Sequence, residues 1–225
     1  MFEGLLDIPR NPGLNDLVYD ALKSAILQHE IPNGSRLDVN QLARKLGVSR
    51  TPVNDAIQRL SVDGLIAVVP RRGTFVARME AKDIHDLLDV RLMFELRAAE
   101  LAIGRIDDGR LRSLEEILVR LDDLLAAPKL DFIQYSKLDI KLHMQPILWV
   151  NNEKLTRLYK AQNFQWYMTR LRKNTAGQRE HWEIFDAYRS GSLEEVKSAL
   201  TRHIEAGKIG VTEFLKETDR RERSQ

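Results

Sequence analysis

Three histidines and one aspartate in the second half of the chain have donor atoms that could hold a metal ion. Asp139 and His143 are four residues apart, so on a helix they lie one above the other on the same face. His181 and His203 follow on two later segments, each among apolar residues at helical spacing. A single histidine in such a place is more often a hydrogen-bonded core residue. Three of them, with a carboxylate that is costly to bury alone, favour a metal site.

Imidazole and carboxylate ligands together suit one divalent ion per subunit, with Zn²⁺ favoured and Ni²⁺, Mn²⁺ or Fe²⁺ as alternatives. Four protein ligands leave an octahedral ion two positions for water or a carboxylate. Arg91 lies on the apolar face of an earlier predicted helix, where an arginine requires an anion. That anion is either Glu95, four residues on, or the carboxylate of a small effector. Gln162 and Trp166 are further candidate effector contacts, although such a tryptophan is more often core.

A second set of polar residues lies nearer the N-terminus and suits double-stranded DNA. Residues 36–78 carry eight Arg or Lys against three Asp, a net charge of +5, whereas the whole chain carries +2. A helix-turn-helix places its second helix in the major groove, where Arg50 could pair with guanine and Asn54 with adenine. Winged helices also bind proteins, but the basic segment favours DNA. The expected DNA contacts are Arg36, Arg44, Lys45, Ser49, Arg50, Thr51, Asn54, Arg71, Arg72 and Gly73.

Hydrophobic spacing predicts the elements that position this second set. Apolar residues recur at helical spacing from Leu14 to His29, and Asp38 is placed to cap a short helix that ends at Leu46. After Gly47, Thr51 is expected to cap the next helix, with Pro52 in its first turn. Two strands follow, over residues 65–69 and 74–77, joined by the turn Pro70-Arg71-Arg72-Gly73. Residues 1–78 are therefore predicted to form a winged helix-turn-helix DNA-binding domain.

The remainder, residues 79–225, is predicted to be an all-α antiparallel bundle of about six helices that binds the metal and the effector. The expected spans are 81–104, 109–127, 130–147, 152–172, 175–190 and 192–217. The fold class is therefore mainly α. The absence of cysteine excludes a disulfide scaffold and thiolate metal sites, and the longest apolar run, Leu65–Val69, is too short to span a membrane. With no secretory signal visible, we expect a cytoplasmic protein that associates with the nucleoid through DNA.

The N-terminal pattern resembles the GntR family of bacterial transcription regulators. The resemblance rests on Leu42-Ala43-Arg44-Lys45-Leu46-Gly47-Val48-Ser49-Arg50-Thr51-Pro52-Val53 and on Arg72-Gly73-Thr74-Phe75-Val76. It covers residues of about 14 to 78. Asn54-Asp55 stands where the family usually has Arg-Glu, and Asn40 stands where an arginine is found in the best-known member of the FadR-type subfamily. Arg50 matches the family pattern. The resemblance implies DNA binding with an operator sequence of its own.

Residues of about 82 to 215 resemble the FCD effector domain of the FadR-type subfamily, in its VanR-like branch. The matching pieces are Asp139-Ile140-Lys141-Leu142-His143, Glu180-His181 and Ala199-Leu200-Thr201-Arg202-His203-Ile204. The resemblance implies that Asp139, His143, His181 and His203 bind one divalent metal and that Arg91 holds a ligand carboxylate. It also implies repression relieved by that ligand.

Three functions follow from these patterns. The first is a homodimeric, metal-containing repressor that binds a palindromic operator and responds to a small carboxylate effector. The second is a regulator whose metal is purely structural. The third is a metal-dependent hydrolase, which we disfavour because no general base stands beside the metal set and an enzyme needs no winged helix.

Overall fold

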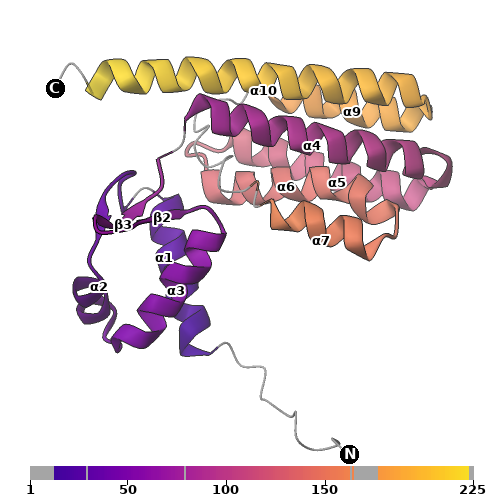
Figure 1. The fold of residues 1–225 in the computed structure, drawn as a ribbon. Coiled ribbons are helices and arrows are strands. Elements are labelled where there is room, and N and C mark those ends of the chain that lie inside the picture. The colour runs from indigo at the N-terminus through magenta and orange to yellow at the C-terminus, as the bar shows by residue number, and fades with distance from the viewer. Residues whose placement is uncertain (1–12, 29, 79, 163, 165–176, 223–225) are drawn as a thin grey trace, which may run out of the picture. The chain divides into compact units, whose positions relative to one another are not determined.

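The computed structural model describes residues 13–28, 30–78, 80–162, 164 and 177–222 (Figure 1). The chain divides into two compact units, Met1–Arg78 and Met79–Gln225, and each is described by itself. The fold class is confirmed: the chain is mainly helical, with a winged helix-turn-helix followed by a helical bundle. No helix among the described residues is long and apolar enough to cross a membrane.

The described part of the N-terminal unit consists of three helices and a small antiparallel sheet. The helices are α1 (Leu14–Leu27), α2 (Val39–Leu46) and α3 (Arg50–Val62). The strands are β1 (Arg36–Leu37), β2 (Ile66–Val69) and β3 (Gly73–Val76), in the sheet order β1-β3-β2. Helices α1 and α3 pack together through buried apolar residues that include Val18, Ile26, Val53 and Leu60. β1 is an addition to the predicted elements, since two residues are too few for a periodic pattern.

The connection between α2 and α3 is set by local chemistry. The side chain of Asp38 accepts hydrogen bonds from the amides of Asn40 and Gln41, as expected of an N-cap. Gly47 ends α2 in the left-handed conformation, with φ of 66°, which a glycine adopts without strain. The expectation that Thr51 caps α3 is wrong, because Ser49 has the extended backbone of the N-cap and the helix begins at Arg50. Pro52 still lies in the first turn, where its missing N–H costs no hydrogen bond.

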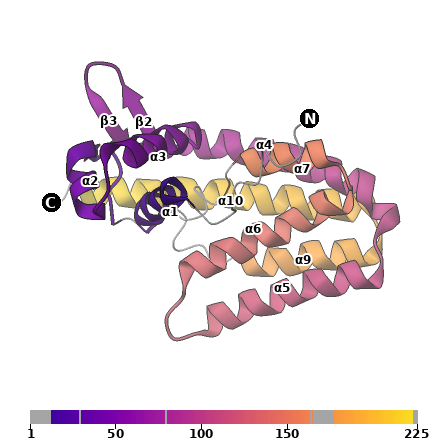
Figure 2. The same ribbon diagram turned by 90° about the horizontal axis from the view of Figure 1, so that it is seen from below.

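The C-terminal unit has six described α-helices and one 3₁₀ turn. They are α4 (Ala81–Ala102), η1 (Ile103–Arg105), α5 (Asp108–Ala126), α6 (Phe132–Trp149), α7 (Glu153–Ala161), α9 (Gly177–Ser190) and α10 (Leu193–Glu222). Five of them form a closed ring, in which α4 packs on α6, α6 on α5, α5 on α9, α9 on α10 and α10 on α4 (Figure 2). α7 packs outside this ring, against α4 and α6.

Two helix ends differ most from those predicted, and the other boundaries agree within one or two residues. The span 152–172 was expected to be one helix, but α7 ends at Ala161, where the amide of Gln162 bonds back to the carbonyl of Tyr159 in a tightened last turn. The last helix continues to Glu222, five residues beyond the expected end at 217. Trp166 lies outside the described residues.

Candidate metal centre and nucleic-acid interface

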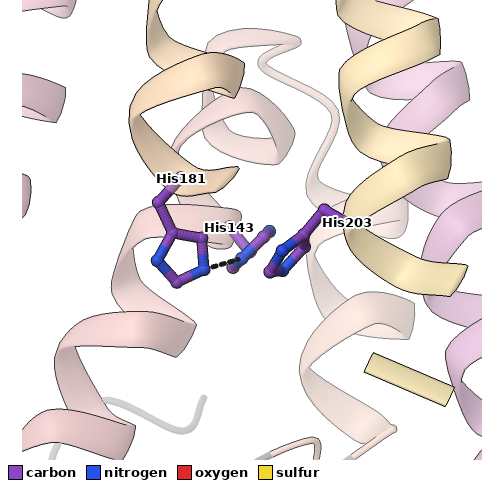
Figure 3. Close-up of side chains that lie close together, drawn as sticks. All are labelled: His143, His181 and His203. Atoms are coloured by element: carbon purple, nitrogen blue, oxygen red, sulfur yellow. Dashed lines mark hydrogen bonds between the residues drawn. The ribbon is translucent and has the colours of Figure 1, made fainter. Parts of the chain in front are cut away.

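The five-helix ring brings three histidines together in its interior (Figure 3). His143 comes from α6, His181 from α9 and His203 from α10, and each offers a nitrogen within 4.8 Å of the others. The Nε2 atoms of His143 and His181 are 3.3 Å apart. His143 and His181 are fully buried, and the His203 side chain is 11% exposed. Three imidazoles from three different helices therefore point at one small volume.

Asp139 joins the histidines from one turn earlier on α6. Its Oδ1 lies 3.2 Å from His181 Nε2. Its Oδ2 has no hydrogen-bond partner among the described residues and lies 3.8 Å from Arg91 Nη2. The carboxylate is 1% exposed, so it is shielded from water. The structure thus brings the three histidines of the predicted metal set within 4.8 Å of one another and places Asp139 against one of them, His181.

The other nitrogen of each imidazole is held by an oxygen that can only accept a hydrogen bond. His143 Nδ1 is 2.9 Å from Glu95 Oε2, His181 Nδ1 is 3.2 Å from Gln178 Oε1, and His203 Nδ1 is 2.8 Å from Glu180 Oε2. Each Nδ1 therefore carries the proton when its ring is neutral. The Nε2 lone pairs then remain as the inward-facing donors, which is the arrangement common to histidine metal ligands.

The orientation of the Gln178 amide is determined by its other contacts. Its Nε2 donates to the carbonyl oxygen of Leu118 at 3.1 Å and to Asp122 Oδ1 at 2.8 Å, and both are acceptors. The amide oxygen must then face His181. Trp182 Nε1 donates to Asp122 Oδ2 at 3.0 Å and so fixes the aspartate. A chain of hydrogen bonds through α5 and α9 therefore orients the His181 ring.

The donor set fits a cation. Burial lowers the pKa of the His143 and His203 imidazoles, so these rings are neutral near pH 7. The Nε2 atoms of His143 and His181 face each other at 3.3 Å, and Asp139 Oδ1 faces His181 Nε2 at 3.2 Å, so nitrogen and oxygen donors gather around a space that a cation could occupy. Nitrogen and carboxylate donors of this kind suit Zn²⁺ and its neighbours in the first transition row. We therefore treat these four residues as a candidate centre for a divalent metal.

Arg91 and Glu95 form a buried pair on α4 beside the histidines. Arg91 Nε donates to Glu95 Oε1 at 2.7 Å, and the hydroxyl of Tyr159 donates to the same oxygen at 2.8 Å. All three residues are 2% exposed or less. Two anions were considered as partners of Arg91, and the structure shows Glu95 in that role. Because Glu95 Oε2 also holds His143, this one carboxylate connects the arginine to the metal set.

A cavity of about 50 Å³ opens beside the cluster, with room for roughly three to five water molecules. Asp139, His181, His203 and Arg91 are among its lining residues. Arg91 thus borders both Glu95 and this space, as an effector contact would. Gln162 is not among the described lining residues, and its side-chain amide donates to the carbonyl of Leu158 at 3.1 Å.

In the N-terminal unit, the predicted DNA contacts lie at the surface. The side chains at the start of α3, those of Arg44 and Lys45 on α2, and the wing arginines Arg71 and Arg72 are exposed. The hydroxyl of Ser49 makes no capping bond, so it is available to an outside partner. Arg71 takes a left-handed backbone, with φ of 62°, at the tip of the β2–β3 hairpin. A Cβ at Gly73 would come within 3.1 Å of Arg36 Nε, so the glycine lets Arg36 lie against the wing.

Comparison with protein-family models decides the family. The model for bacterial regulatory proteins of the gntR family matches residues 14–76, and the FCD domain model matches residues 86–206. The chain is a GntR-family regulator with an FCD domain. YdhC, an HTH-type transcriptional regulator of Bacillus subtilis, is 28% identical over 82% of this chain and 85% of its own. The HTH-type transcriptional repressor RspR of Escherichia coli is 24% identical over 88% of each chain.

A solved structure agrees with this assignment at the level of the fold. A GntR transcriptional regulator from Rhodococcus sp. RHA1 matches with a TM-score of 0.72 and 24% identity, over 88% of this chain and 97% of that one. The family and its named relatives indicate that this GntR regulator is a DNA-binding transcription regulator and not an enzyme.

Sequence reasoning missed several residues that support the candidate metal centre of this regulator. Gln178, Glu180 and Asp122 orient ligands, and Tyr135 lines the cavity, but none was predicted to do so. The sequence could have indicated Glu180, because this carboxylate directly precedes the predicted metal ligand His181. Glu95 was considered only as the partner of Arg91, whereas it also holds His143. Burial raises the pKa of Tyr135, so its hydroxyl stays protonated at neutral pH.

The DNA interface of this regulator gives a first testable prediction. Replacing Arg50 by alanine should weaken binding to a selected operator by about 1–3 kcal/mol, because a bidentate contact to guanine would be lost. Fluorescence anisotropy at fixed salt measures this, with duplexes selected by the wild-type protein from a random library. Arg97→Ala on α4 removes the same charge from an exposed pair with Glu100 and should bind as the wild type does. Equal affinity of Arg50→Ala and wild type would remove α3 from base reading.

Proposed function

We propose that this regulator is a homodimeric repressor that binds a palindromic DNA operator and contains one divalent metal in each FCD domain. A single reading helix covers too few base pairs for specificity, whereas a two-fold dimer reads two half-sites. The name of the relative RspR as a repressor supports this direction of control. In this proposal the start of α3 reads bases, and the wing arginines contact the adjacent groove.

The metal is proposed to bind through Asp139, His143, His181 and His203, with Zn²⁺ as the favoured ion. The observation behind this is the convergence of three imidazole nitrogens inside a buried site, with the Asp139 carboxylate 3.2 Å from one of them, His181 Nε2. A metal there would supply a positive centre able to accept a carboxylate oxygen. The chain's own part is to hold the rings in one tautomer.

The effector is proposed to be a small carboxylate bound at the metal beside Arg91. The support is the cavity that borders both the metal set and the arginine. Such a ligand would weaken operator binding only if it favours a dimer arrangement whose reading helices no longer match the half-site spacing. The alternative of a purely structural metal predicts no response to carboxylates.

The effector response can be measured as operator affinity. Zinc-loaded protein should bind the selected operator, and a small carboxylate should weaken this binding by roughly 5- to 150-fold, an ordinary coupling of about 1–3 kcal/mol. Arg91→Ala should retain zinc and operator binding but lose most of the response, because the arginine borders the ligand cavity. A carboxylate that binds the zinc-loaded protein without changing operator affinity would contradict the proposed mechanism. If the carboxylate weakens operator binding of Arg91→Ala as much as that of the wild type, Arg91 does not contact the effector, and its role is only to pair with Glu95.

A further inference from the structure

A second cavity, of about 10 Å³, lies next to the histidines inside the five-helix ring. Among the described lining residues, His181 is the only one that it shares with the first cavity. On α4 the first cavity is lined by Arg91 and the second by Glu95, one helical turn further along. Every residue that lines the second cavity is buried. The two cavities are therefore distinct spaces that both border the histidine cluster.

The hydroxyl of Tyr188 is a buried donor at the second cavity. Tyr188 comes from α9 and is 2% exposed, and its hydroxyl has no hydrogen-bond partner among the described residues. Burial raises the pKa of this hydroxyl well above its ordinary value, and the Glu95 carboxylate raises it further, so the group is protonated at neutral pH. A buried O–H that donates to nothing loses its hydration without compensation. The folded protein is therefore more stable if this cavity contains an acceptor for Tyr188.

Two hydrogen-bond acceptors belong to residues that line the same cavity. The first is Glu95 Oε2, which accepts from His143 Nδ1 at 2.9 Å and has the capacity for a second bond. The second is the carbonyl of Leu142 on α6. Pro146 lies four residues later inside this helix and has no N–H to donate to that carbonyl. One donor and two acceptors are thus available around the space.

The volume and the polar groups both match a single water molecule. A space of about 10–15 Å³ is the smallest that holds one water, and a buried water typically makes about three hydrogen bonds. Water can accept the Tyr188 O–H while it donates one proton to the Leu142 carbonyl and the other to the Glu95 carboxylate. All three polar groups then have complementary partners, whereas any larger ligand exceeds the available volume.

We propose that this cavity is a binding site for one internal water molecule, which connects the Tyr188 hydroxyl on α9 to the Leu142 carbonyl on α6 and the Glu95 carboxylate on α4. The water joins three helices of the ring beside the histidines. It also gives Glu95, which holds His143, a support from α9 in addition to its contacts with α4 and α7. The proposal does not depend on the effector, because no residue of this bridge lines the first cavity.

Tyr188→Phe and Tyr159→Phe form a matched pair of variants that tests the bridge. The Tyr159 hydroxyl donates directly to Glu95 Oε1 at 2.8 Å, and both tyrosines are 2% exposed or less. Urea unfolding of the full chain, followed by tryptophan fluorescence, should give a lower midpoint for both variants than for the wild type, because each loses a satisfied hydrogen bond. Without a partner in the cavity, loss of the Tyr188 hydroxyl would remove an unpaired polar group. A midpoint of Tyr188→Phe equal to or above that of the wild type would therefore overturn the proposal.

Crystal structures at a resolution that shows ordered water locate the molecule directly. The wild type should contain one density peak within hydrogen-bonding distance of the Tyr188 hydroxyl, the Leu142 carbonyl and the Glu95 carboxylate. The peak should weaken or vanish in Tyr188→Phe and remain in Tyr159→Phe. A second cavity without density in the wild type would overturn the proposal even if Tyr188→Phe is destabilised, because that loss would then come from packing.

Discussion

Replacement of both His181 and His203 by alanine is expected to abolish metal binding and to remove the stabilisation that the metal provides. Two of the three imidazoles that converge in the ring interior would be lost, which leaves one nitrogen and one carboxylate. Because the ion binds the folded site and not the unfolded chain, wild-type protein in zinc at a thousand times its dissociation constant should gain about 4 kcal/mol. The double variant should gain almost nothing, as measured by metal analysis and by urea unfolding with and without zinc.

The control for this experiment is His85→Ala. His85 Nε2 lies 3.1 Å from the carbonyl of Lys208 and 3.0 Å from the hydroxyl of Thr212, so this histidine also connects α4 to α10 but lies outside the cluster. Its replacement should reduce stability with and without zinc equally and leave the metal content unchanged. All three tryptophans follow residue 79, so tryptophan fluorescence reports the unfolding of the C-terminal unit alone. Full zinc occupancy in the double variant would show that the metal set is wrong.

Sequence patterns predicted the structure best for features that depend only on residues close together in the chain. Asp38 as a cap, Gly47 as a turn, and Asp139 beside His143 depend on neighbours within four residues, and the structure contains each of these arrangements. Helical spacing also placed His181 and His203 on inward faces. It could not show that α6, α9 and α10 lie next to one another, and only the resemblance to the FCD domain grouped their histidines.

The supporting residues depend on packing that periodicity does not encode. Gln178 orients His181 only because α5 packs on α9 and brings Leu118 and Asp122 to its amide. The hydroxyl of Tyr159 reaches Glu95 only because α7 packs on α4. The end of α7 at Ala161 was missed because no glycine or proline marks it. Polar residues on such contacts look like ordinary surface residues until their partners in the fold are known.

Glu95→Gln is expected to produce a large loss of stability in this regulator. The variant keeps the shape of the side chain but removes the charge that pairs with Arg91 at 2.7 Å. Breaking a buried ion pair costs about 3–5 kcal/mol, and we expect the lower part of this range because Arg91 keeps Asp139 at 3.8 Å. The matched control is Glu100→Gln on the same helix, because Glu100 pairs with Arg97 and Lys197 at the surface. An exposed pair of this kind contributes about 0–1 kcal/mol. Urea unfolding of metal-free protein measures both losses.

The dependence on pH separates this charge effect from a loss of packing. Burial alone would raise the pKa of Glu95, but the neighbouring His143 and Arg91 hold it at about 2, against an ordinary 4.5. A carboxyl whose pKa is lowered by folding stabilises the protein fully above 4.5, and this stabilisation is lost as the pH falls towards 2. The lowering corresponds to about 3 kcal/mol. The difference in unfolding free energy between metal-free wild type and Glu95→Gln should therefore shrink as the pH falls below about 4.5 towards 2. A difference that does not change down to the lowest pH at which the wild type remains folded would attribute the loss to packing and not to the Glu95 charge.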